Sequence, residues 1–162
     1  MKQLKVLGID PGLKATGVGI IDYDGNKINV KWKVISFEEG DLGTRIYNYY
    51  RKMKEFIKKE GPDVAVMESI FYGENTKTLI HLGELRGAYI LLLKELRIPL
   101  FEFSPREIKI AITGSGAASK DKVNFIVKNM LNVKKEIPVD ASDALANSLV
   151  YLLRKDDRLS KR

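Results

Sequence analysis

Two lone carboxylates stand where apolar segments of the sequence end. Asp10 ends "VLGID" and Glu68 ends "VAVME", both of which are typical of short buried strands. Asp10 also begins a Pro-Gly turn, and an aspartate at that position can bond its own backbone, so turn chemistry alone would explain it. If the two strands are neighbours in a sheet, however, the two acids lie side by side at one edge, where α/β proteins bind their ligands.

A second pair of acids, Asp140 and Asp143, lies in "VDASDALA" at the start of the last predicted helix. A spacing of three residues places both on one face of that helix. Acids are also common in a first helical turn, as cap and dipole partners, so this pair does not by itself require a function. The apolar segment that follows predicts that the helix packs on the sheet and directs its first turn toward the other two acids.

Four converging carboxylates would repel one another unless cations were bound between them. Mg²⁺ is a hard cation that prefers oxygen ligands, and Mn²⁺ is a possible substitute. Two such ions about 4 Å apart activate a water and stabilise the leaving oxygen in phosphodiester cleavage. Zinc does not fit, because the chain has no cysteine and only one histidine, His81, which we expect to be a packing or surface residue.

The composition fits a single globular domain over residues 1–162 with a nucleic-acid partner. Hydrophobic residues make up 44% and charged residues 30% of the chain, and 28 Lys and Arg against 21 Asp and Glu give a net charge of +7. This charge favours a polyanion such as DNA, although a lysine-rich surface would produce it too. The apolar run at 88–93 is too short to span a membrane, and the chain begins without a signal-peptide core, so we expect a cytoplasmic protein.

The order of predicted elements indicates an α/β fold. We expect strands at 5–10, 16–23, 27–36, 64–69 and 98–103. We expect helices at 42–60 (capped by Asp41), 77–96, after Ser104-Pro105, and at 119–131 and 140–154. The first three strands follow one another by short turns and are antiparallel, whereas the last two each follow a helix and join the first strand in parallel. The prediction is a five-stranded mixed sheet with helices on both faces.

Six motifs in order resemble one known family. They are "GIDPG" with "TGVG", "ESIFYGEN", "GELRGA", "SPREIK", "TGSGAASK" and "DASDALA". With these motifs the chain resembles the RuvC-type Holliday-junction resolvases, of ribonuclease H-like fold, over nearly its full length. The resemblance implies a metal-dependent endonuclease that resolves four-way DNA junctions in recombination and repair. It also implies a homodimer that makes paired symmetric nicks and works with a branch-migration helicase complex.

The resemblance also assigns residues. It implies that Asp10, Glu68, Asp140 and Asp143 form the catalytic tetrad that binds metal, with two Mg²⁺ ions as the expected cofactors. Lys109 and Lys120 match the active-site lysines of the family, and Phe71 matches an aromatic residue that stacks on a base near the crossover. We expect further DNA contacts from five residues: Tyr72, Asn75, Arg86, Gly114 and Gly116.

Some residues have more than one interpretation or depart from the family pattern. Gly83 and Gly87 lie four apart on one predicted helix and permit close helix packing, either in the core or across a dimer. Glu74, Ser115 and Ala117 are unusual for the family and bear on DNA contacts rather than on the metal site.

Three other functions are compatible with parts of the sequence. One is a nuclease of the same fold that acts on RNA–DNA hybrids, and another is a structured-DNA-binding protein without activity. The third is a nucleotide-binding domain of the actin and sugar-kinase superfamily, for which 162 residues are too few, because two such domains enclose the nucleotide.

Overall fold

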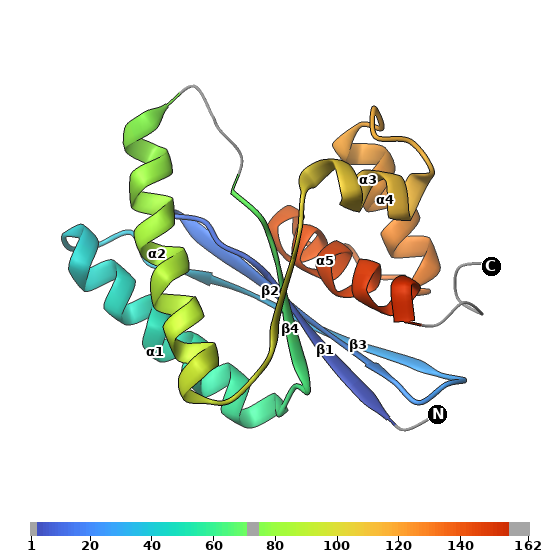
Figure 1. Cartoon of the computed structure of the whole chain (residues 1–162), viewed down its shortest axis with the longest axis horizontal. Coiled ribbons are helices and arrows are strands. Elements are labelled where there is room, and N and C mark those ends of the chain that lie inside the picture. The colour runs from blue at the N-terminus through green and yellow to red at the C-terminus, as the bar shows by residue number, and fades with distance from the viewer. Residues whose placement is uncertain (1–2, 71–74, 156–162) are drawn as a thin grey trace.

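A five-stranded mixed sheet forms the centre of the computed structural model, which describes residues 3–70 and 75–155 (Figure 1). The strand order is β3-β2-β1-β4-β5. The strands are β1 (Leu4–Asp10), β2 (Ala15–Tyr23), β3 (Ile28–Ser36), β4 (Val64–Glu68) and β5 (Leu100–Phe103). The first three pair antiparallel, and β4 joins β1 and β5 in parallel. The predicted fold class is confirmed.

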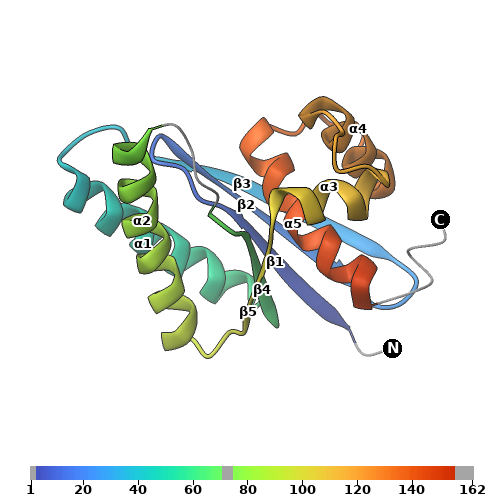
Figure 2. The ribbon, with the colours of Figure 1, turned by 45° about the horizontal axis from the view of Figure 1, so that its top comes forward.

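Helices cover both faces of this sheet, as Figures 1 and 2 show. One face carries α1 (Leu42–Glu60) and α2 (Thr76–Glu95), and the other carries α3 (Pro105–Thr113), α4 (Lys120–Met130) and α5 (Val139–Lys155). Successive residues of β1 point to opposite faces: Val6 packs in the core beneath α5, and Leu7 packs in the core beneath α1 and α2. From Val6 to Ile9 the central strand therefore has no polar side chain, and the next residue is Asp10.

Local signals set the helix boundaries. Asp41 caps α1 as predicted, with its side chain accepting from the Thr44 backbone N–H at 2.8 Å. Only β5 differs appreciably from prediction, because it begins at Leu100 rather than at 98. The reason is that the Ile98 N–H donates to the Leu93 carbonyl and so belongs to the turn that ends α2.

Within the described residues, no helix is long and apolar enough to cross a membrane.

Three strand glycines let α5 lie directly on the backbone of the sheet. A Cβ atom at Gly8 would lie 1.7 Å from the Ala144 carbonyl oxygen, and one at Gly17 would lie 1.9 Å from the Asp140 carbonyl oxygen. A Cβ atom at Gly19 would lie 2.6 Å from the Leu145 side chain. At Gly8 and Gly17 a side chain would require the helix to move, because the atoms in the way belong to its backbone. The glycines therefore fix where the first turn of α5, and with it the second pair of acids, lies.

Candidate active site

Asp10 and Glu68 lie at adjacent strand ends. The parallel register pairs Ile9 with Met67, so the next residue on each strand is the carboxylate. This confirms the prediction that these two strands are neighbours and that their acids share one edge of the sheet. On its other side, Asp10 is opposite Gly17 of β2, the residue on which the first turn of α5 lies.

The electrostatics show that all four acids converge on this edge. Burial raises the pKa of Asp10 to about 7, and the negative charges of Asp143, Asp140 and Glu68 contribute, in that order, to the same shift. The pKa values of Glu68 and Asp143 are also raised, mainly by burial. The sequence placed these acids on three separate segments, and the fold brings them within electrostatic reach of one another.

Two lysines supply positive charge at the same place. The Lys120 ammonium, at the start of α4, lies 2.6 Å from a carboxylate oxygen of Asp143, and this contact raises the lysine's pKa. The charges of Lys120 and of Lys109, on α3, offset part of the rise in the pKa of Glu68 that burial causes. Both lysines line a hollow of about 280 Å³ together with Glu68, Asp143 and Asn147. A second hollow of about 250 Å³ is lined by Asp10, Glu68 and residues of α2, so Glu68 lies between the two.

The carboxylate oxygens of the four acids are suitable ligands for hard divalent cations, although they do not form a complete coordination site. Among the residues that the structure describes, no three His, Asp or Glu side chains are already arranged to hold an ion. Their oxygen donors, their partial burial and their mutual repulsion nevertheless favour a cation between them, because a positive charge there stabilises the ionised carboxylates and offsets their repulsion. In this structure the ammonium of Lys120 supplies the positive charge beside Asp143.

Asn147 is part of this site, and the sequence reasoning missed it. The side chain is only 2% exposed, and its amide N–H donates to the Ile9 carbonyl, just before Asp10, at 3.0 Å. Its Oδ1 atom is buried without a hydrogen-bond partner in the structure. The available signal was its spacing of four residues from Asp143, which places it on the same face of α5.

The structure corrects the expected DNA contact by Arg86. This residue is 6% exposed, and its guanidinium donates to the Glu68 backbone carbonyl and pairs with the Glu102 carboxylate. A side chain buried and bonded at both ends is not available to a phosphate. Arg86 belongs to the interior behind Glu68.

The other expected DNA contacts have mixed outcomes. Asn75 is exposed and caps α2, since its side chain accepts from the Thr78 backbone N–H. Gly114 ends α3 with φ of 77°, which is a conformational reason for glycine, and Gly116 lies against the Arg106 side chain. Phe71 and Tyr72, together with Glu74, lie outside the described residues. His81 is paired with Glu84 at the surface.

This sheet order, with acids at the ends of β1 and β4 and on a helix packed across them, defines a nuclease domain of the ribonuclease H-like class. RuvC of Thermus thermophilus has the same fold, with a TM-score of 0.86 at 24% identity over 94% of this chain and 95% of that one. The same protein in complex with a Holliday junction substrate gives a TM-score of 0.88. The yeast mitochondrial Holliday junction resolvase gives 0.65 at 15% identity.

The family model for crossover junction endodeoxyribonuclease RuvC matches residues 6–151. Relatives of that description include one from Caldanaerobacter subterraneus, 36% identical over 152 residues (91% of this chain, 92% of the relative). Another, from Thermotoga maritima, is 35% identical over 161 residues (98% and 96%). The chain belongs to the RuvC family, and as a member it is a crossover junction endodeoxyribonuclease.

Proposed function

We propose that this endonuclease resolves four-way DNA junctions with a pair of divalent cations bound by Asp10, Glu68, Asp140 and Asp143. The observation that carries the proposal is the convergence of these acids: burial, together with the negative charges of the other three, raises the pKa of Asp10 to about 7. Mg²⁺ is the expected ion, with Mn²⁺ as a substitute. When bound, such ions supply an activated water and stabilise the leaving oxygen of the cleaved phosphodiester.

The lysines act on the DNA strand that is cut. The Lys120 side chain is 62% exposed, so it can leave Asp143 and pair with the scissile phosphate. Lys109 approaches from α3 on the other side of the same hollow. Their positive charges offset the charge that develops on the phosphate in the transition state, where a preorganised cation contributes most. Asn147 holds the backbone before Asp10 and so keeps that acid in place.

Paired nicks require two active sites, and α2 offers a surface for a second copy. Ile80 and Leu91 are 57% and 63% exposed, and Gly83 and Gly87 lie between them on the same side of the helix. Nothing in the described part of the chain lies within 4 Å of a Cβ atom built at either glycine, so packing within the chain does not explain them. We infer that this stripe (Ile80, Gly83, Gly87 and Leu91) packs against its counterpart in a homodimer.

Family membership supports two further expectations, a cytoplasmic location and a partnership with a branch-migration helicase complex. The role of Phe71 in stacking on a base at the crossover also remains a prediction.

The decisive experiment offers three labelled substrates, a four-way junction, a linear duplex and an RNA–DNA hybrid, with and without Mg²⁺. We expect paired symmetric nicks in the junction only, and only with Mg²⁺. Glu68→Gln should abolish cutting but keep junction binding, whereas Glu136→Gln, at a carboxylate 96% exposed and paired with Lys128, should cut like the parent. Preferential cutting of the hybrid would indicate a different nuclease of this fold, and binding without cutting would indicate a structural role.

A further inference from the structure

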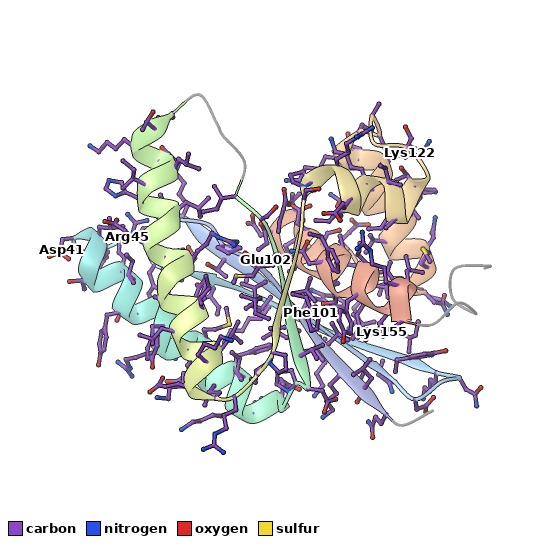
Figure 3. The ribbon with its side chains drawn as sticks, in the orientation of Figure 1. Asp41, Arg45, Phe101, Glu102, Lys122 and Lys155 are labelled. Atoms are coloured by element: carbon purple, nitrogen blue, oxygen red, sulfur yellow. The ribbon has the colours of Figure 1, made fainter. Side chains whose placement is uncertain are left out.

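The interior behind Glu68 contains a buried cation that the proposed chemistry does not use. Arg86 projects from α2 toward the sheet, and one guanidinium nitrogen lies 2.6 Å from the backbone carbonyl of Glu68. The other end of the guanidinium pairs with Glu102 of β5, which lies between α2 and α5 in the view of Figure 3. Burying a charge is costly unless it is paired and hydrogen-bonded, so both bonds are needed to keep Arg86 in this place.

The two partners of Arg86 are neighbours in the sheet. The parallel register of β4 and β5 pairs Met67 with Glu102 and Glu68 with Phe103. The guanidinium therefore bridges α2, the last residue of β4 and the adjoining strand at one point. Since the carbonyl that it holds is that of Glu68 itself, any shift of Arg86 moves the backbone that carries this carboxylate.

We propose that Arg86 is a positioning residue that fixes the end of β4 so that the Glu68 carboxylate is held where it binds the metal ion. It acts through the Glu68 backbone and does not touch DNA, and Glu102 orients its guanidinium. The inference depends on the proposed role of Glu68 in metal binding. Planar geometry is essential to it, because one guanidinium reaches two acceptors in a fixed direction, whereas an ammonium is a single point charge.

The test compares Arg86→Gln, Arg86→Lys and Glu102→Gln with the parent. Arg154→Gln is the matched control, because Arg154 also pairs with a glutamate (Glu107, at 3.1 Å) but on the exposed surface. Four quantities are measured: the Mg²⁺ concentration for half-maximal cutting, calorimetric binding of Mn²⁺ to the free protein, junction affinity without metal, and the thermal unfolding midpoint.

We expect Arg86→Gln to weaken Mn²⁺ binding and to raise the half-saturating Mg²⁺ concentration by about tenfold or more, as for other residues that orient metal ligands. Junction affinity should stay close to that of the parent. Arg86→Lys should recover part of the loss, and Glu102→Gln should show a smaller effect of the same kind, because it frees only one end of the guanidinium. Arg154→Gln should match the parent in metal dependence.

The proposal is overturned if the Arg86 and Glu102 variants lower the unfolding midpoint but bind Mn²⁺ and respond to Mg²⁺ as Arg154→Gln does. It is also overturned if Arg86→Gln loses junction affinity with unchanged metal dependence, which would make Arg86 a DNA contact. Should Arg86→Gln not fold, Arg86→Lys and Glu102→Gln decide the question. A parent that binds Mn²⁺ without cutting junctions contradicts the proposed function, and the calorimetric comparison still tests Arg86.

Discussion

At the scale of single residues, Asp10 has the most unfavourable environment of the four acids. It is partly buried at the end of β1, opposite the Gly17 on which the first turn of α5 lies, and the three other carboxylates raise its pKa further. A group with a raised folded-state pKa makes the folded protein less stable wherever the unfolded chain has already lost the proton. The metal-free site therefore lowers the stability of the folded protein at neutral pH, and the cations of our proposal would offset this loss.

This predicts a pH dependence of stability in EDTA. The Asp10 pKa is about 7 in the folded protein and near 3.8 when unfolded, so the folded state holds a proton between these values. Its contribution to stability should fall as pH rises from about 4 to about 7, by roughly 2–4 kcal/mol in total. Asp10→Asn should consequently gain more unfolding free energy over the parent at pH 8 than at pH 5. Urea titrations measure this, and an equal gain at both pH values would contradict it.

Lys120 should affect chemistry more than binding. We expect Lys120→Ala to lower the single-turnover cutting rate on the order of 10²-fold, because charge stabilisation is lost where the transition state needs it. Junction affinity should fall much less, since one phosphate contact among many is removed. Lys122→Ala, two residues along α4 and also exposed, is the control and should keep the parental rate (Figure 3). Equal losses of rate and affinity in Lys120→Ala would make it an ordinary DNA contact.

At the scale of elements, the position of α5 determines the site. This helix lies on three strand glycines, and at Gly17 the backbone of the sheet approaches the carbonyl of Asp140 itself. Asn147 then ties the helix to the Ile9 carbonyl, and Ser148 donates to the Gly19 carbonyl at 3.3 Å. Because both attachments lie within one turn or two of the acids, the helix cannot shift without moving them.

Gly17→Ala should therefore damage the site and the fold together. Its methyl carbon would need the space of the Asp140 carbonyl, and we expect a loss of about 1–3 kcal/mol in unfolding free energy. Cutting at saturating Mg²⁺ should fall further than the folded fraction does. Gly43→Ala on α1 is the control, because there the added carbon would make only an ordinary 3.5 Å contact. A Gly17→Ala protein with parental stability and rate would show that α5 can lie elsewhere.

At the scale of the whole molecule, the two helical layers differ in what they leave exposed. The layer of α3, α4 and α5 carries the lysines and the second pair of acids, and it faces the DNA in our proposal. The layer of α1 and α2 leaves the stripe of Ile80, Gly83, Gly87 and Leu91 without a partner in the described chain. In our proposal, one face of the domain serves catalysis and the other serves assembly.

Measuring the oligomeric state of variants tests whether this stripe forms the dimer contact. Leu91→Glu should convert the dimer to a monomer in light scattering at micromolar concentration, because a charge would be buried at the contact. Gly87→Ala should stabilise the isolated helix by roughly 0.5–1 kcal/mol, yet weaken the dimer if the helices approach closely. Phe125→Glu, at an exposed aromatic on α4, should leave the dimer intact. A monomeric parent, both free and bound to a junction, would contradict the dimer.

The amino-acid sequence by itself determined the class of the fold and pointed to the acids that the fold brings together. Alternating and helical apolar patterns depend on local geometry, so they predicted all five strands and the helices within two or so residues. Lone carboxylates at the ends of apolar segments marked Asp10 and Glu68 in the same way. Even the cap of α1 by Asp41 was visible, because a cap is a contact between residues three apart.

Only the tertiary structure decided which role the remaining residues have. In the sequence, the positive charge of Arg86 suggested a DNA contact. Its burial depends on where β4 and β5 lie, which no local pattern specifies. Asn147 likewise gains its partner, Ile9, from 138 positions away. In the sequence, the glycines of β1 and β2 are poor strand formers without an evident role. In the folded protein they leave the space that the backbone of α5 needs. Contacts between segments distant in the chain create each of these roles, and those contacts exist only once the chain has folded.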